Sequence, residues 1–80
     1  MDEQLGHMGP LPLPEGVVFS QALSNRIFLE TAVRVSYRSR KQWGPGMFLI
    51  LVGPPDQLQE AFNRVILYGT AVGGGGGGEG

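Results

Sequence analysis

Residues 33–53 read VRVSYRSRKQWGPGMFLILVG, which is two strand patterns joined by a turn. From Val33 to Arg38, apolar and polar residues alternate, as in a strand with one buried and one wet face. From Met47 to Val52 every residue is apolar, which favours the centre of a sheet over its edge. Gly44-Pro45-Gly46 between them is a strong turn signal. The segment therefore predicts an antiparallel hairpin.

Helical periodicity flanks this hairpin on both sides. Upstream, apolar residues at helical spacing predict a helix within residues 17–31. Downstream, one apolar stripe at helical spacing comprises Leu58, Ala61, Phe62, Val65 and Ile66. Gly69 is placed to end that second helix. The order helix, strand, loop, strand, helix predicts a small α+β domain, in which a two- or three-stranded antiparallel sheet packs against two or three helices.

Length and composition limit the class of protein. The chain has 80 residues and no cysteine, so a disulfide and a thiolate metal site are both excluded. Residues 1–14, with three prolines and two glycines, predict a disordered lead, and the glycine-rich residues 73–80 a disordered tail, which leaves residues 15–72 for the domain. The longest apolar run is far below the ~20 residues of a membrane span, and the N-terminus is unlike a signal peptide. We expect an intracellular protein, cytoplasmic or nuclear, without membrane contact.

The sequence offers little chemistry for catalysis. The single histidine, His7, falls in the predicted disordered lead, and the carboxylates Glu30, Asp56 and Glu60 belong to different elements. No group of residues has metal-ligand spacing. The glycine run lacks the strand, helix and lysine that surround a phosphate loop. We therefore predict that the protein is not an enzyme and that it uses no metal, cofactor or small-molecule substrate.

Positive charge is concentrated in one segment, although the formal net charge is −1. Five of the six basic residues lie in residues 26–41 and only one acid, Glu30, opposes them there. Cations that contact phosphates and aromatic rings that stack on bases are the ingredients of a single-stranded nucleic-acid surface. The predicted wet face of the strand and the following loop supply such residues, namely Arg34, Ser36, Arg38, Arg40, Lys41 and Trp43. A solvated charged surface explains the same pattern, so both interpretations stay open.

The order of these elements resembles the second half of a type I KH domain, a single-stranded RNA- and DNA-binding module. That half reads E-T-G-A-x-I-x-I, followed by a variable loop, a strand that ends in glycine and an amphipathic helix. Residues 30–35, ETAVRV, are similar to the first phrase with its glycine deleted, and residues 48–66 are similar to the remainder. The loop from Tyr37 to Gly46 resembles the variable loop in the KH-like repeats of Bicaudal-C relatives. The resemblance covers about residues 20–68.

One part of the KH pattern is missing. A KH domain clamps nucleotide phosphates with a G-x-x-G loop before its second helix, and no such glycine pair precedes Glu30. Either the domain is degenerate, with residues 11–18 supplying its first strand, or the chain is a fragment. A ferredoxin-like or other small α+β half-domain is the alternative fold.

Two functions follow from the resemblance. The first is an RNA-associated module that binds single-stranded RNA weakly through the second strand and the variable loop. The second is a module for protein–protein contact or dimerisation with no nucleic-acid role, because KH-like repeats without the clamp tend to pack on partners. The apolar character of residues 47–52 on both faces favours this second function, since an uncovered apolar surface drives docking.

Overall fold

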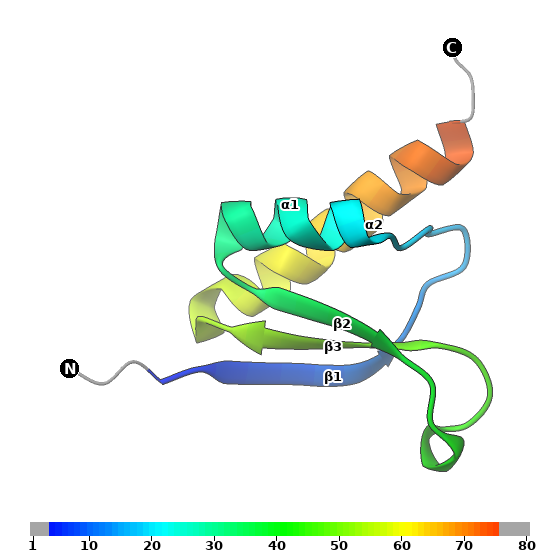
Figure 1. Ribbon diagram of the computed structural model, residues 1–80, viewed down its shortest axis with the longest axis horizontal. Helices are drawn as coiled ribbons and strands as arrows, with labels where there is room; N and C mark the ends of the chain where they lie inside the picture. The colour runs from blue at the N-terminus through cyan, green and yellow to red at the C-terminus, as the bar shows by residue number, and fades with distance from the viewer. Residues whose placement is uncertain (1–3, 76–80) are drawn as a thin grey trace.

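A three-stranded antiparallel sheet with two helices on one of its faces forms the domain (Figure 1). The computed structural model describes residues 4–75. Its elements are, in chain order, β1 (Gly6–Pro12), α1 (Gln21–Thr31), β2 (Arg34–Arg38), the 3₁₀ turn η1 (Lys41–Trp43), β3 (Phe48–Gly53), the 3₁₀ turn η2 (Pro55–Gln57) and α2 (Leu58–Gly75). The predicted α+β class and the predicted antiparallel hairpin are confirmed.

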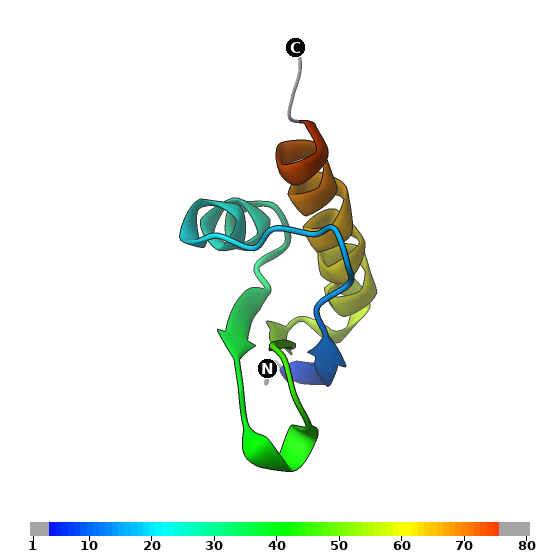
Figure 2. The same cartoon turned by 90° about the vertical axis from the view of Figure 1, so that its right-hand side faces the viewer.

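The apolar strand β3 occupies the centre of the sheet, in the spatial order β1-β3-β2. Its alternate residues Leu49, Leu51 and Gly53 are buried beneath the helices. Both helices lie on this side, and no described element covers the other side (Figures 1 and 2). The buried core between sheet and helices consists of Val17, Leu23, Ile27, Val33, Val35, Leu49, Leu51, Leu58, Ala61 and Val65.

The prediction of a disordered lead in residues 1–14 is wrong for residues 6–12, which form strand β1. Met8 pairs with Leu51 and packs against the core, and Leu11 does the same opposite Leu49. The prolines are tolerated because β1 is an edge strand with a neighbour on one side only. A register shift between Met8 and Leu11 accommodates the chain around Pro10. The domain therefore begins before residue 15, and residues 1–3 lie outside the described part.

Helix α1 is shorter than the predicted range of residues 17–31. The Ser20 hydroxyl accepts a hydrogen bond from the Leu23 N–H at 3.2 Å and so caps its first turn. The helix ends at Ala32, whose φ of 65° is left-handed and whose N–H donates to the Phe28 carbonyl. Val17 precedes the helix and belongs to the buried core. The residues between β1 and Ser20 therefore form an irregular connection, with a turn at Glu15-Gly16, that packs against the core through Val17.

Gly69 does not end the second helix, because α2 continues to Gly75. Gly69 instead permits a close approach: a Cβ placed on it would lie 2.5 Å from Cγ1 of Val17 and 2.9 Å from the carbonyl oxygen of Val18. The Gly69 carbonyl accepts a hydrogen bond from the Val18 N–H at 3.3 Å. The helix also includes the start of the predicted glycine tail at residues 73–75. Residues 76–80 of that tail lie outside the described part.

Candidate nucleic-acid interface

Strand β2 presents three of the predicted site residues on the side of the sheet that the helices do not cover. Arg34, Ser36 and Arg38 alternate along the strand with Val35, which is buried in the core, and with Tyr37, which is exposed and lies beside the Phe19 ring. In the ladder they lie opposite Val52, Ile50 and Phe48 of β3, respectively. Both arginines are exposed and Ser36 is half-buried. The strand phase therefore orients these residues as the sequence predicted.

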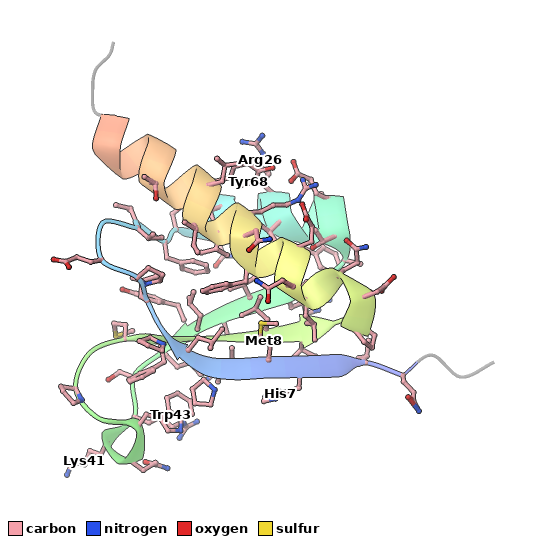
Figure 3. All side chains as sticks on the ribbon, turned by 180° about the vertical axis from the view of Figure 1, so that it is seen from behind. His7, Met8, Arg26, Lys41, Trp43 and Tyr68 are labelled. Atoms are coloured by element: carbon pink, nitrogen blue, oxygen red, sulfur yellow. The ribbon has the colours of Figure 1, made fainter. Side chains whose placement is uncertain are left out.

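The loop after β2 carries the other three predicted site residues. Arg40 and Lys41 are exposed, and Lys41 points away from the sheet (Figure 3). Trp43 ends the turn η1 and lies edge-on to Phe48, with ring centroids 5.6 Å apart. The Arg40 guanidinium lies 5.6 Å from the centroid of the Trp43 ring. The loop thus adds two cations and an aromatic ring that is already partly covered.

The basic residues fall into two sets by their ion pairs. Arg26 contacts Glu30 at 3.1 Å, and Arg64 contacts both Glu30 at 2.6 Å and Glu60 at 2.8 Å. By contrast, four cations form no ion pair with any carboxylate in residues 4–70, namely Arg34, Arg38, Arg40 and Lys41. The positive charge available for a ligand is therefore concentrated on β2 and the loop.

A groove lies between α1 and the outer edge of β2. Its volume is about 230 Å³, and its lining residues are Gln21, Ser24, Asn25, Phe28, Arg34, Val35 and Ser36. The guanidinium of Arg34 lies 4.7 Å from the centroid of the Phe28 ring, so a cation and an aromatic ring meet at the groove wall. The helical residues of this groove were not predicted as site residues. The only signal for them in the sequence is that Gln21, Ser24 and Asn25 form a polar face of this helix.

The backbone edge of β2 borders the same groove. The Ser24 hydroxyl donates a hydrogen bond to the Val35 carbonyl at 3.2 Å, so Val35 directs its backbone polar groups away from β3. Outward and inward groups alternate along an antiparallel strand, so Tyr37 also directs its backbone groups outward. The Val35 carbonyl is already bonded to Ser24, and the outward backbone groups of Tyr37 lie between Arg34 and Arg38 on this edge.

A separate polar cluster joins α1 to α2 and has a structural role. The Tyr68 hydroxyl donates to Glu30 at 2.5 Å, and Arg26 lies 3.9 Å above the Tyr68 ring (Figure 3). The hydrogen bonds from Tyr68 and then Arg64 lower the pKa of Glu30 from 4.5 to about 2. The hydrogen bonds that Arg64 donates to Glu30 and to Glu60 raise the pKa of Arg64. This cluster satisfies its own charges and leaves none for a ligand.

The lowered pKa of Glu30 predicts a pH-dependent contribution to stability. Its ionised form stabilises the folded state above pH 4.5, and this stabilisation is lost as the pH falls towards about 2. We expect wild-type protein to exceed Glu30→Gln in unfolding free energy near pH 7, and the difference to vanish near the folded-state pKa. Urea unfolding at a series of pH values measures both curves. Parallel curves for the two proteins would contradict the assignment.

Comparisons with family models, with curated proteins and with solved structures give no match to this chain. Within residues 4–75, no three acidic or histidine side chains gather as metal ligands would. Neither α1 nor α2 is long and apolar enough to cross a membrane. The interpretation of the site therefore depends on its own geometry and charge.

Proposed function

We propose that the chain is a KH-like, RNA-associated domain that lacks the phosphate clamp and binds single-stranded nucleic acid weakly through β2 and its loop. The observation that carries the proposal is that the ion-paired and the unpaired basic residues lie on different elements. Both arginines of the helical layer are ion-paired, whereas the four basic residues of β2 and the loop form no ion pair with any carboxylate of residues 4–70. Unpaired cations along one strand are available to phosphates, and each such contact releases bound counterions.

The order of the elements supports the KH resemblance. A first strand and a helix precede the hairpin, and a long amphipathic helix follows it. Compared with the KH pattern, one helix and the G-x-x-G loop are missing between α1 and β2. Without the clamp, the affinity must come from side-chain contacts on the remaining wall, so we expect weak binding.

The groove beside β2 has the composition expected for a site that accepts one base. Unstacked bases are recognised by stacking on aromatic or arginine planes and by hydrogen bonds to their edges. Phe28 and Arg34 supply the planes, and the amides of Gln21 and Asn25 together with the β2 edge supply polar groups. Its volume of about 230 Å³ lies below the ~300 Å³ at which drug-sized ligand sites begin. A single planar base is therefore a better fit than a larger ligand.

Neutralising the four unpaired cations tests this proposal. In the variant R34Q/R38Q/R40Q/K41Q we expect weaker binding to a pool of short single-stranded RNA and a flatter dependence of affinity on salt. Each phosphate contact on a single strand contributes ~0.7 to the slope of log K against log salt, so four contacts lower it by as much as ~2.8. Fluorescence anisotropy at several salt concentrations measures the slope.

Arg26→Gln provides the matched control, because it removes one positive charge that is already paired with Glu30. We expect this variant to keep the wild-type slope. An unchanged slope in the quadruple variant, with dispersed amide resonances showing that it folds, would refute the proposal. So would equal losses in the quadruple variant and the control.

A second candidate function is protein–protein contact, which a different observation favours. The side of the sheet away from the helices contains apolar side chains of β3 that no described element covers. This surface shares Arg34 and Ser36 with the groove, but its apolar centre on β3 lies outside the groove.

A further inference from the structure

The open face is the surface of the sheet that points away from α1 and α2. Phe48, Ile50 and Val52 of β3 form its centre, because they alternate with the buried residues of that strand. The ladder places Arg34, Ser36 and Arg38 along the β2 side, and His7 and Pro12 along the β1 side. Figure 3 shows His7 on this side of β1 and Met8 on the opposite side, towards α2.

The centre of the open face has the wrong composition for a surface in permanent contact with water. An antiparallel sheet with one solvated side alternates apolar residues inward with polar residues outward. On β3 the outward residues are instead an aromatic and two β-branched side chains, all half-buried only by their neighbours. Trp43 extends the apolar surface at one end through its contact with Phe48. A sheet face of this kind is normally covered by a further layer, either a helix or another sheet.

Charge restricts what that layer can be. Arg34 and Arg38 lie along one side of the apolar centre, and Arg40 and Lys41 follow in the loop. None of the three strands contains an aspartate or a glutamate. The open face is thus apolar with a positive border and no negative charge on any strand, so it is complementary to an apolar surface with a negative border.

We propose that the open face docks an amphipathic helix of a partner protein, with acidic residues along one side of its apolar stripe. Arg34 and Arg38 are four residues apart on an extended strand, which separates their Cα atoms by ~13 Å. Carboxylates two helical turns apart are separated by ~11 Å along the helix axis. A helix lying along β3 therefore brings acids at positions i and i+7 or i+8 near the two arginines, and its apolar stripe covers the residues of the centre. The Arg34 guanidinium, which lies 4.7 Å from the centroid of the Phe28 ring of α1, turns towards the partner's acid on docking.

Two other occupants fit this surface less well. A second copy of the chain would bring a second pair of guanidinium groups to the interface and no strand carboxylate to neutralise either pair. Single-stranded nucleic acid complements the arginines, but aromatic rings lie at one end of the face only, where Trp43 contacts Phe48. The aliphatic side chains Ile50 and Val52 offer no plane for base stacking along the rest of β3. The acidic amphipathic helix satisfies both the apolar centre and the charged border.

A display library tests the proposal. The library presents helices with a constant leucine stripe, whose flanking positions are randomised between glutamate and lysine. We expect selection on the wild-type protein to enrich glutamate on one flank, with affinities in the micromolar range. We expect selection on R34E/R38E to enrich lysine at the same positions. Amide shifts with an enriched synthetic peptide should centre on Phe48, Ile50 and Val52.

Two single variants serve as matched tests. Ile50→Ser should weaken the binding of the enriched peptide at least tenfold. Leu29→Ser should leave the affinity unchanged, because this side chain is 84% exposed on α1, away from the open face. Dispersed amide spectra of both variants show that they fold. The proposal fails if no charge pattern is enriched, if the pattern is the same for R34E/R38E, or if binding survives Ile50→Ser. It also fails if sedimentation shows a dimer that Ile50→Ser dissociates, because the occupant is then a second copy.

Single-stranded RNA separates this proposal from the proposed function. If RNA shifts the amides of α1 and β2 around the groove and the peptide shifts those of the β3 centre, both hold. If RNA shifts the β3 centre and no peptide does, nucleic acid occupies the open face and the docking proposal is wrong. If the peptide binds and RNA shifts nothing, the docking proposal holds and the proposed function fails.

Discussion

Truncation of Leu51 to alanine is expected to lower the unfolding free energy by about 2–5 kcal/mol. Leu51 is fully buried at the middle of β3, where it lies opposite Met8 of β1 and Val35 of β2. Its removal leaves a cavity that the two neighbouring strands and the helices cannot all close at once. Small domains have total stabilities near the lower end of about 5–15 kcal/mol. The variant is therefore expected to be partly unfolded at room temperature.

The neighbouring residue supplies the control for this prediction. Ile50→Ala removes the same kind of side chain from the same strand, but on the open face, where Ile50 is half-buried. We expect a loss of about 1 kcal/mol, because only part of its apolar surface is removed from water in the folded state. Urea unfolding of both variants measures the difference. Equal losses would mean that the open face is covered in the isolated protein, contrary to the arrangement of its elements.

The hairpin and α2 could be predicted because their burial patterns are regular along the chain. The alternation in residues 33–38 and the continuous apolarity in residues 47–52 each identify a strand without knowledge of its neighbours. Strand β1 has no such pattern, since Pro10 and a register shift interrupt its alternation between Met8 and Leu11. A strand of this kind exists because β3 offers it a hydrogen-bonding edge. Only the folded sheet reveals that edge, so the sequence suggested disorder.

For the candidate site too, features that depend on one strand could be predicted from the sequence, and features that depend on tertiary packing could not. The phase of β2 predicts which way Arg34 and Arg38 point, because that depends on the strand alone. The sequence could not separate Arg26 from them, although Arg26 lies in the same basic segment and is bound to Glu30. The groove residues of α1 were missed for a related reason. Their relation to β2 depends on how the helix packs on the sheet, which no spacing along the chain encodes.

Gly69→Ala is expected to destabilise the protein, in contrast to its usual effect inside a helix. In an exposed helix, alanine is favoured over glycine by about 1 kcal/mol. Here the new Cβ would lie 2.5 Å from Cγ1 of Val17 and 2.9 Å from the Val18 carbonyl oxygen. Overpacking of this kind typically costs about 1–3 kcal/mol. Because one obstacle is backbone, we expect a net loss within that range and a midpoint about 4–8 °C lower for each kcal/mol.

Thermal unfolding of three further variants distinguishes the steric cost of Gly69→Ala from its effect on helix propensity. Thr70→Ala changes an exposed neighbour on α2 and should stay within about 0.5 kcal/mol of wild type. V17A/G69A removes the side-chain obstacle but keeps the Val18 carbonyl, so with Val17→Ala it completes a double-mutant cycle. We expect the cycle to show that part of the Gly69→Ala penalty disappears once Val17 is truncated. A stabilised Gly69→Ala would mean that α2 does not pass this close to the connection before α1, and that the glycine has no packing role there.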